Sequence, residues 1–234
     1  MKYKAVIFDL GGTLVQSVPL EGQQRSLAQI ASVLSVPADD FGRLWLETTS
    51  ERRTGVFQSN ENNIEHICNE LGVPQKGNQI RVAAQIVADL TAHMMENIRE
   101  DTTAVLSRLK SKGYKLGLIS DCNPEVPLLW ETSPLAPLFD AAVFSCSAGM
   151  QKPDARIYQL AADQLRIEPT DCIYIGDGGS RELSGASQVG MYPVLIRVSV
   201  EESNNPYRLN SEEWNGPAIS SLTELLELVT QVSP

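Results

Sequence analysis

A short apolar run near the N-terminus ends at an aspartate that is soon followed by two glycines. Residues 5–8 read Ala-Val-Ile-Phe, and four apolar residues in a row suit a strand buried on both faces of a parallel sheet. Asp9 follows directly, at the kind of strand end where open α/β sheets bind ligands. Gly11 and Gly12 allow a tight turn and a close approach of the backbone to a small ligand. The junction by itself also suits an aspartate that caps an ordinary turn.

Strand-like and helical segments alternate through most of the chain. The alternation predicts an α/β fold with a doubly wound, Rossmann-like parallel sheet as its core. The strand-like runs cover residues 5–8, 116–119, 141–144, 172–175, 194–198 and 218–220. The helical patterns after residue 101 cover residues 102–112, 155–166, 180–189 and 222–229.

The segment between the first strand and residue 101 carries helical patterns without a convincing strand. These patterns cover residues 21–34, 40–53, 61–71 and 78–99. About 80 helical residues are far more than an ordinary crossover needs. We therefore expect a four-helix α-helical cap domain over residues 16–99, inserted into a core domain made of residues 1–15 and 100–234. Helices that only pad the sheet are the alternative.

Composition and charge exclude several classes of partner. The 234 residues are 42% hydrophobic and carry a net charge of −10, which argues against nucleic acid and anionic membranes as partners. Apolar runs stay well short of the ~18 residues that span a bilayer, and the N-terminus lacks a signal-peptide profile, so we expect a cytoplasmic protein. Any anionic substrate must then be bound by a few placed cations and backbone amides. The sequence does not predict the oligomeric state.

The four cysteines are scattered along the chain without CxxC spacing. They are Cys68, Cys122, Cys146 and Cys172. We expect reduced thiols, although the spacing leaves a disulfide open.

Three further segments place polar side chains just beyond strand-like runs. Ser120 offers a hydroxyl and neighbouring amides, and Lys152 stands before Pro153, which suits a helix start. Asp177 lies among glycines expected to leave it exposed, and Glu182 lies little more than a helical turn beyond. Taken singly, these residues suit a turn hydroxyl, a solvated lysine and loop or helix-end acids. Their joint order along the chain indicates one functional site.

In these segments the chain resembles the haloacid dehalogenase-like (HAD) hydrolase superfamily, in the subfamily with a helical C1 cap. Residues 8–14, Phe-Asp-Leu-Gly-Gly-Thr-Leu, look like its first motif, and Ser120 falls where the second has Ser or Thr. Lys152 matches the third motif, and Asp177 with Glu182 looks like the acidic fourth. The helical insertion lies where that subfamily has its cap. The resemblance covers nearly the whole chain.

The resemblance implies a hydrolase, most simply a phosphatase that acts on a small phosphorylated metabolite. Asp9 would be the nucleophile that forms an aspartyl-phosphate, and Lys152 would supply positive charge to the reaction. A Mg²⁺ cofactor would be held by Asp9, the Gly11 carbonyl and Asp177, with Glu182 bound directly or through water. The residues implied to bind substrate phosphate are Leu10, Gly11, Ser120, Asp121 and Lys152.

One position departs from the family pattern. Family phosphatases usually carry a second aspartate two residues after the nucleophile, where it protonates the leaving group, and this chain has Gly11 there. General acid–base catalysis contributes about 10²–10⁴-fold, so we expect ordinary phosphomonoesters to be poor substrates and acyl or nitrophenyl phosphates to be better ones. Asp121 and Glu47 are the candidate replacements. His66 and His93 suit solvated helix faces better.

Other functions stay open on the sequence alone. Loss of the acid would suit a non-catalytic or weakly active phosphate-binding protein. Dehalogenases of the superfamily use no metal and lack the fourth-motif aspartate present here, whereas phosphonatases need a cap lysine, and Lys76 lies in a turn. Arg52 and Arg53 are the adjacent basic pair of the insertion, and suit either an anionic substrate tail or a solvated helix end.

Overall fold

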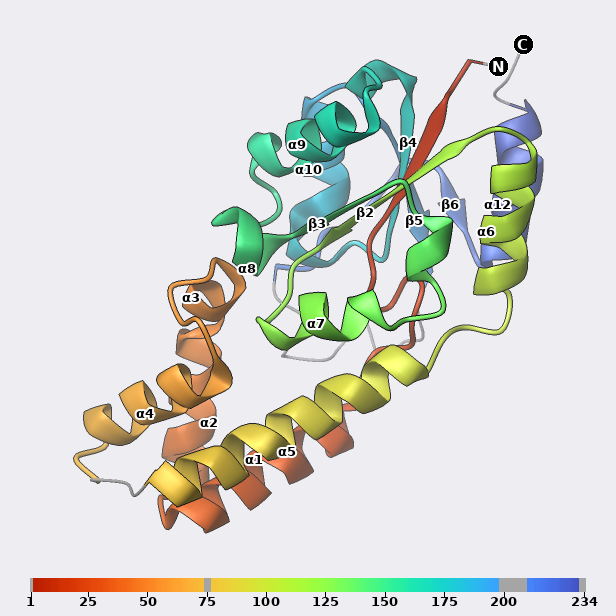
Figure 1. The fold of residues 1–234 in the computed structure, drawn as a ribbon. Helices are drawn as coiled ribbons and strands as arrows, with labels where there is room; N and C mark the ends of the chain where they lie inside the picture. The colour runs from red at the N-terminus through yellow and green to blue at the C-terminus, as the bar shows by residue number, and fades with distance from the viewer. Residues whose placement is uncertain (1, 74–76, 198–209, 232–234) are drawn as a thin grey trace.

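A six-stranded parallel sheet forms the centre of the molecule, with β1 in its interior. The computed structural model describes residues 2–73, 77–197 and 210–231. The strand order is β3-β2-β1-β4-β5-β6, and every neighbouring pair is parallel (Figure 1). This confirms the predicted doubly wound α/β class. The strands are β1 Ala5–Phe8, β2 Lys115–Ser120, β3 Ala141–Phe144, β4 Cys172–Gly176, β5 Tyr192–Ile196 and β6 Ala218–Ile219.

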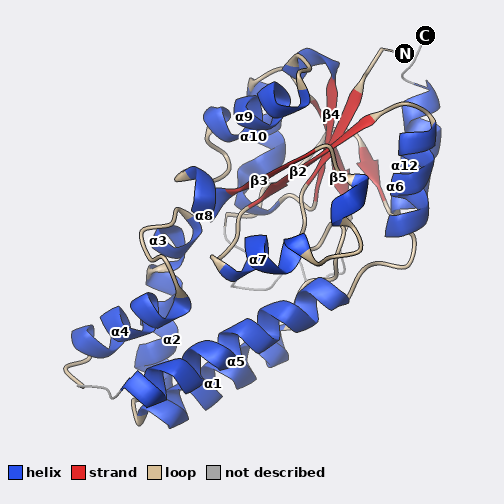
Figure 2. Cartoon of the chain, viewed as in Figure 1, coloured by secondary structure: helices blue, strands red, loops and turns tan. Residues whose placement is uncertain are grey.

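Alternate residues of β1 enter two separate hydrophobic layers. Val6 and Phe8 pack into the layer that contains α6 and α12, whereas Ala5 and Ile7 pack into the layer that contains α9 and α10. Figure 2 shows these helices on the two sides of the sheet. All four strand residues are fully buried, as expected for a central parallel strand. The helices of the two layers are α6 Thr102–Ser111 with α12 Leu222–Gln231, and α9 Ala155–Leu165 with α10 Glu182–Gln188.

The segment between β1 and α6 folds into helices with a hydrophobic cluster of their own. Its described residues form five helices where four were predicted, because the helix breaks at Thr48, whose hydroxyl donates back to the Leu44 carbonyl at 2.8 Å. Figure 1 shows these helices below the sheet, with α5 running past α7. The predicted boundaries of a cap domain stay predictions. The helices are α1 Leu20–Leu34, α2 Ala38–Glu47, α3 Thr49–Arg53, α4 Asn60–Glu70 and α5 Gly77–Glu96.

Several short elements depart from the sequence predictions. The expected helix at 180–189 is wrong at its start, because Ser180 and Arg181 have left-handed backbone and α10 begins at Glu182. Pro153 does not begin α9, whose N-cap is the Asp154 side chain. Residue 198 of the predicted fifth strand lies outside the described residues. Elements without a predicted counterpart are α7 Glu125–Glu131, α8 Ser145–Ala148, η1 Ala136–Leu138 and η2 Pro169–Asp171, and η3 Gly179–Arg181 is a separate 3₁₀ turn before α10.

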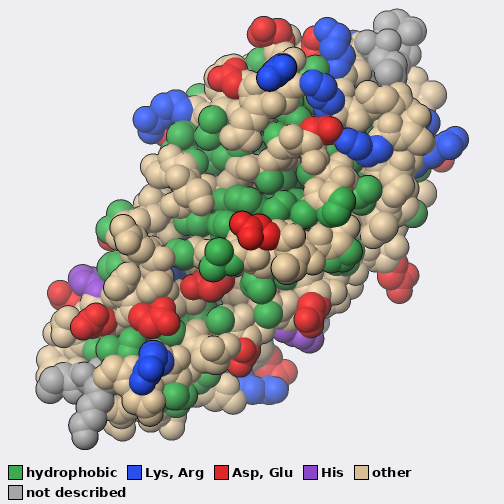
Figure 3. All heavy atoms as spheres, in the orientation of Figure 1, with side chains coloured by type: hydrophobic (Ala, Val, Ile, Leu, Met, Phe, Trp, Pro, Cys, Tyr) green, Lys and Arg blue, Asp and Glu red, His purple; other side chains and the backbone are tan. Residues whose placement is uncertain are grey.

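The surface drawn in Figure 3 carries scattered charges around a middle zone of hydrophobic side chains. This zone extends from the region of β2 and β3 toward α7, whose Leu128 is 69% exposed. Within the described ranges, no helix combines the length and the apolar character that a membrane crossing requires.

Two helix glycines with different surroundings give a matched pair of stability variants. A Cβ added at Gly42 of α2 meets no atom within 4 Å, so Gly42→Ala should raise the free energy of unfolding by about 0.5–1 kcal/mol through helix propensity. A Cβ added at Gly185 of α10 would lie 2.6 Å from the Tyr158 hydroxyl oxygen. Gly185→Ala should therefore lower the free energy of unfolding by about 1–3 kcal/mol. Urea unfolding followed by circular dichroism measures both, and equal effects would contradict the predicted clash.

Candidate active site

The carboxyl ends of β1 and β4 bring two aspartates to one edge of the sheet. Asp9 follows β1, and its backbone amide donates to the Ile175 carbonyl of β4 at 2.9 Å. Asp177 follows Gly176, the last residue of β4. In the strand order, β1 is followed by β2 toward one edge of the sheet, whereas β4 is followed by β5 toward the opposite edge. The two aspartates therefore lie between β1 and β4, at the topological switch point where α/β sheets bind ligands.

Lys152 connects two carboxylates in the interior of the site. Its Nζ donates to Asp9 Oδ1 at 2.6 Å and to Glu182 Oε2 at 2.5 Å. All three residues are buried, with Lys152 only 4% exposed, so the solvated-lysine alternative is wrong. The Lys152 backbone amide also donates to Asp121 Oδ1 at 3.0 Å. The loop after β2 therefore holds the lysine in the position from which it reaches both acids.

Glu182 is held by partners on both of its carboxylate oxygens. Tyr174 of β4 donates its hydroxyl to Oε2 at 2.8 Å, and the Gly178 amide donates to Oε1 at 2.9 Å. A Cβ at Gly176 would lie 2.2 Å from Oε1, so glycine is required for this approach. Tyr174 was not among the site residues predicted from the sequence. Its signal was a tyrosine inside a fully buried strand, where the hydroxyl needs a partner.

Asp177 is buried rather than exposed, contrary to the sequence-based expectation. Its exposed fraction is 8%, and its Oδ1 accepts a hydrogen bond from the Gly179 amide at 2.8 Å. Gly12 has a left-handed φ of 81°, and a Cβ there would lie 2.6 Å from Asp177 Oδ2. The glycines thus let the main chain approach the carboxylates closely.

Burial and mutual charge shift the proton affinities of the cluster. Burial raises the pKa of Asp9, against the opposing effect of the Lys152 ammonium. Burial likewise raises the pKa of Glu182 well above its ordinary value. Burial alone would lower the pKa of Lys152, but the charges of Asp9 and Glu182 outweigh it and hold that pKa well above the usual range. The Lys152 side chain is therefore charged. The raised pKa values of Asp9 and Glu182 mean that a further cation, or protons, would stabilise these buried carboxylates.

The carboxylates fit a divalent metal ion. One oxygen each of Asp9, Asp177 and Glu182 can be chosen so that all three lie within 4.8 Å of one another. Such hard oxygen donors are the ligands that Mg²⁺ prefers. The Lys152 ammonium forms ion pairs with two of these acids, Asp9 and Glu182. A metal ion held by the three carboxylates would place a second cation beside the lysine.

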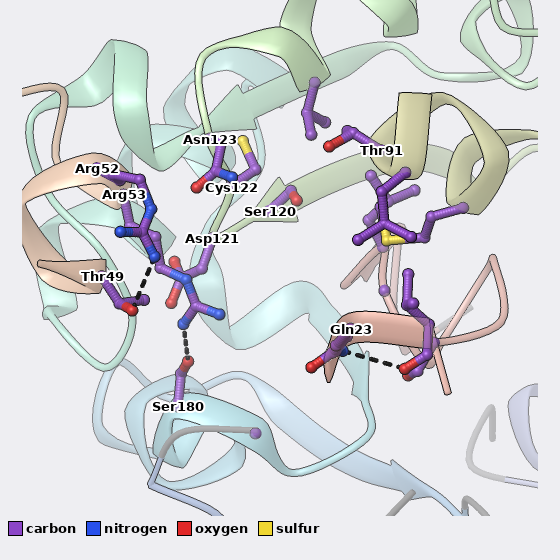
Figure 4. Close-up of a pocket in the computed structure, with 18 of the residues that line it drawn as sticks. Gln23, Thr49, Arg52, Arg53, Thr91, Ser120, Asp121, Cys122, Asn123 and Ser180 are labelled. Atoms are coloured by element: carbon purple, nitrogen blue, oxygen red, sulfur yellow. Dashed lines mark hydrogen bonds between the residues drawn. The ribbon is translucent and has the colours of Figure 1, made fainter. Parts of the chain in front are cut away.

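The other predicted phosphate-binding residues lie around the same cavity. Leu10, Gly11, Ser120 and Asp121 line a cavity of about 310 Å³ together with Lys152. Figure 4 shows Ser120 and Asp121 at the end of β2 facing this space. A Cβ at Gly11 would meet no atom within 4 Å, so that position borders open space. The cavity continues to apolar side chains of α1 and α5, namely Leu27, Ile30, Val87, Leu90 and Met94.

The two arginines of α3 have different surroundings. Arg52 is 3% exposed and stacks on Trp45, with 3.8 Å between the guanidinium carbon and the ring centroid, so it is not a solvated helix end. Burial lowers its pKa to about 9. Arg53 instead reaches across the cavity, where its Nη1 donates to Ser180 Oγ at 3.5 Å (Figure 4). Arg53 is therefore the arginine that lies nearer to the β4 side of the site.

Of the residues weighed as replacements for the missing acid, Asp121 lines the cavity, whereas Glu47, His66 and His93 do not. Asp121 lines the cavity, and its Oδ2 is buried without a hydrogen-bond partner among the described residues. Glu47 is ion-paired with Arg43 on the surface of α2, at 3.1 Å. His66 and His93 are exposed on α4 and α5. Of the two candidate replacement acids, Asp121 is therefore the one that lines the cavity.

The chain belongs to the haloacid dehalogenase-like hydrolase family, whose model matches residues 3–190. The predicted superfamily and the hydrolase class are confirmed by this match. A similar relative along the whole chain is the glyceraldehyde 3-phosphate phosphatase of Methanopyrus kandleri, 24% identical with 98% of both chains covered.

Other relatives match over only part of their length. Haloacid dehalogenase-like hydrolase domain-containing protein 3 of Bos taurus is 30% identical over 49% of this chain and 46% of its own. The chain thus spans about half the length of that relative. Among solved structures, a HAD phosphatase from Thermococcus onnurineus is 22% identical, covers 97% of both chains and has a TM-score of 0.67. A 2-haloacid dehalogenase from Pseudomonas syringae pv. Tomato has a TM-score of 0.68 and is 21% identical. At such low identity, these two structures show the fold alone.

The two adjacent glycines after Asp9 should respond differently to the same substitution. Gly12→Ala places a Cβ against Asp177 Oδ2 and should weaken Mg²⁺ binding by about 10–100-fold, since displaced supporting contacts cost that much in metal sites. The added methyl group of Gly11→Ala would lie in open space, so this variant should keep a Mg²⁺ affinity within about twofold of that of the parent protein. Isothermal titration calorimetry with MgCl₂ measures both affinities. Equal Mg²⁺ affinities of the two variants would show that Asp177 takes no part in metal binding.

Proposed function

We propose that this hydrolase is a Mg²⁺-dependent phosphatase that uses Asp9 as its nucleophile on a small phosphorylated metabolite. The observation that carries the proposal is the buried contact of Lys152 with Asp9, at 2.6 Å, beside the metal-compatible acids Asp177 and Glu182. Phosphoryl transfer needs an in-line nucleophile and neutralisation of the charge on the transferred group. In this proposal Asp9 would supply the nucleophile, and Lys152 with the bound metal ion would supply the neutralising charge.

The residues of the chain suggest a division of labour. Asp9 would form a bond to phosphorus while the bond to the leaving oxygen breaks, and water would later hydrolyse the aspartyl-phosphate. Lys152 would orient Asp9 and offset negative charge on the phosphoryl group. Ser120 and the amides after β1 would bind the phosphoryl oxygens. Mg²⁺ bound to Asp9, the Gly11 carbonyl, Asp177 and Glu182 would supply further positive charge to the same oxygens.

The missing acid at Gly11 limits the substrates that the proposal covers. The leaving oxygen has no carboxyl group at the position two residues beyond Asp9, so it must depart with little help or take a proton from Asp121. Acyl phosphates and nitrophenyl phosphates have stable leaving groups and tolerate this loss. We therefore propose a phosphorylated substrate with an activated leaving group.

The comparisons support a phosphatase over the other activities of the family. The Methanopyrus relative, which matches over nearly its whole length, is named a glyceraldehyde 3-phosphate phosphatase, and this agrees with a small phosphorylated substrate. Asp177 next to Asp9 favours a metal-dependent reaction over metal-free dehalogenation. Lys76, the lysine weighed for phosphonatase chemistry, lies outside the described residues.

A phosphate-binding protein without turnover is the second candidate, and Gly11 is the observation that favours it. Such a protein would keep the acidic cluster and Ser120 for binding. Calorimetry with Mg²⁺ and orthophosphate, combined with assays of turnover, separates the two functions. Binding without hydrolysis of any activated phosphate would support the second candidate.

Replacement of the nucleophile tests the proposed function directly. Asp9→Asn should reduce Mg²⁺-dependent hydrolysis of p-nitrophenyl phosphate by at least about a thousandfold, as loss of a nucleophile does in other enzymes. Glu47→Gln, which neutralises an exposed carboxylate outside the cavity, should retain activity and serves as the control. Undiminished turnover by Asp9→Asn would refute the nucleophile assignment.

Restoring the acid tests the role assigned to Gly11. Gly11→Asp should raise kcat/KM for alkyl phosphates by about 10–100-fold, because the open space accepts a side chain and the new carboxyl group can protonate the leaving oxygen. Gly11→Asn has nearly the same size without the acid and should give no gain. If the two variants behave alike while Mg²⁺ binding is intact, another group already serves as the acid. Asp121→Asn in the parent protein then identifies whether Asp121 is that group.

A further inference from the structure

Two of the four cysteines lie side by side at the edge of the candidate site. Ser120 of β2 pairs with Phe144 of β3 in the parallel sheet, and Cys122 and Cys146 each follow two residues later. Their Sγ atoms are 3.8 Å apart. The backbone amide of Cys122 also donates to Ser145 Oγ at 3.0 Å, so a second contact holds the two segments together. The sheet register therefore fixes a thiol pair that the sequence spacing did not reveal.

The two thiols differ in exposure and acidity, as an attacking and a resolving thiol do. Cys146 is half-buried on α8, and its hydrogen bonds, first with Cys122 and then with Ser147, lower its pKa to about 7. Burial raises the pKa of Cys122 well above its ordinary value. The lowered pKa favours the thiolate of Cys146, which is the reactive form of a thiol. Burial raises the pKa of Cys172 to about 12 and also raises that of Cys68.

We propose that Cys122 and Cys146 form a modification site, in which a hydroperoxide converts the two thiols to a disulfide that weakens phosphate binding. The Cys146 thiolate attacks the peroxide oxygen, an S–O bond forms as the O–O bond breaks, and the departing hydroxide (or alkoxide) takes up a proton. Cys122 then attacks the Cys146 sulfenic sulfur, the S–S bond forms and water leaves with the Cys122 proton. The two thiols lose two electrons in total and the hydroperoxide gains them. A dithiol reductant reverses the change by thiol–disulfide exchange.

We expect disulfide formation to pull on the loop that carries the proposed phosphate contacts. The sulfurs have to approach by about 1.8 Å, from 3.8 Å to the length of a disulfide bond. Cys122 directly follows Asp121, whose carboxylate accepts a hydrogen bond from the Lys152 backbone amide. Ser120 precedes Asp121, so both predicted phosphate-binding residues of this loop are next to the thiol. This part of the inference rests on the phosphate-binding role proposed for that loop.

The same disulfide would also act on the helix that carries the cavity arginine. A Cβ at Gly55, two residues after Arg53, would lie 2.2 Å from the Cys146 carbonyl oxygen, so the chain after α3 lies directly against α8. Gln151 donates to Ser50 Oγ of α3 at 3.2 Å and adds a second contact near α8. A shift of α8 is therefore transmitted to α3 as well as to the loop after β2.

Mass spectrometry and phosphate binding test the two parts of the inference separately. The full-length protein is treated with graded hydrogen peroxide, digested and searched for a peptide that joins Cys122 to Cys146. Orthophosphate binding in the presence of Mg²⁺ is measured by calorimetry before oxidation, after it and after dithiothreitol. We expect the 122–146 disulfide, a fall in phosphate affinity of about 10–100-fold as for a displaced binding group, and full recovery on reduction.

Two serine variants provide the controls. Cys146→Ser should bind phosphate as the parent protein does and should lose its sensitivity to peroxide. Cys68→Ser changes a thiol of α4 that is buried in the hydrophobic cluster of the inserted helices, so this variant should stay sensitive. Absence of the 122–146 cross-link overturns the modification site. A cross-link with unchanged phosphate affinity overturns its effect on binding. The disulfide is detected without any turnover, so failure of the proposed phosphatase activity gives a different result from failure of this inference.

Discussion

The buried ammonium of Lys152 is the interaction on which the rest of the site depends. It lies between Asp9 and Glu182, and each of these acids is further positioned by strand ends, glycine amides or a tyrosine hydroxyl. Without the ammonium, the carboxylates of Asp9 and Glu182 would be buried without their shared ion-pair partner, which is strongly unfavourable. The lysine therefore stabilises these two acids in the fold, beside the oxygens that suit a metal ion.

The sequence predicted the parts of the molecule that follow from periodicity and strand ends. The parallel sheet with its central β1 was expected from apolar runs, because buried strands and turn residues carry strong local signals. The proximity of Asp9, Lys152 and Asp177 agrees with the predicted site, since parallel strands end at one edge. Their catalytic roles stay predictions.

Features set by three-dimensional contacts were beyond the sequence. The burial of Asp177, the partners of Arg52 and the partner of the Tyr174 hydroxyl depend on how separate elements pack against one another, which local pattern does not encode. The break at Thr48 depends on a side-chain hydrogen bond that competes with the helix, so one predicted helix became two. The Cys122–Cys146 pair depends on the register of β2 and β3, which no spacing rule supplies.

The wide separation of Asp9 and Lys152 has a consequence for the order of folding. Their contact joins residues 143 positions apart, and β1 pairs with β2 and β4, which follow it by more than 100 residues. Contacts of such long range form late, because the loop entropy must be overcome first. Asp9 is synthesised well before Lys152 and can form its buried ion pair only after Lys152 has been added to the chain. The site is therefore assembled late in folding, and a chain cut short before β4 would carry the proposed nucleophile without Asp177 and Glu182 beside it.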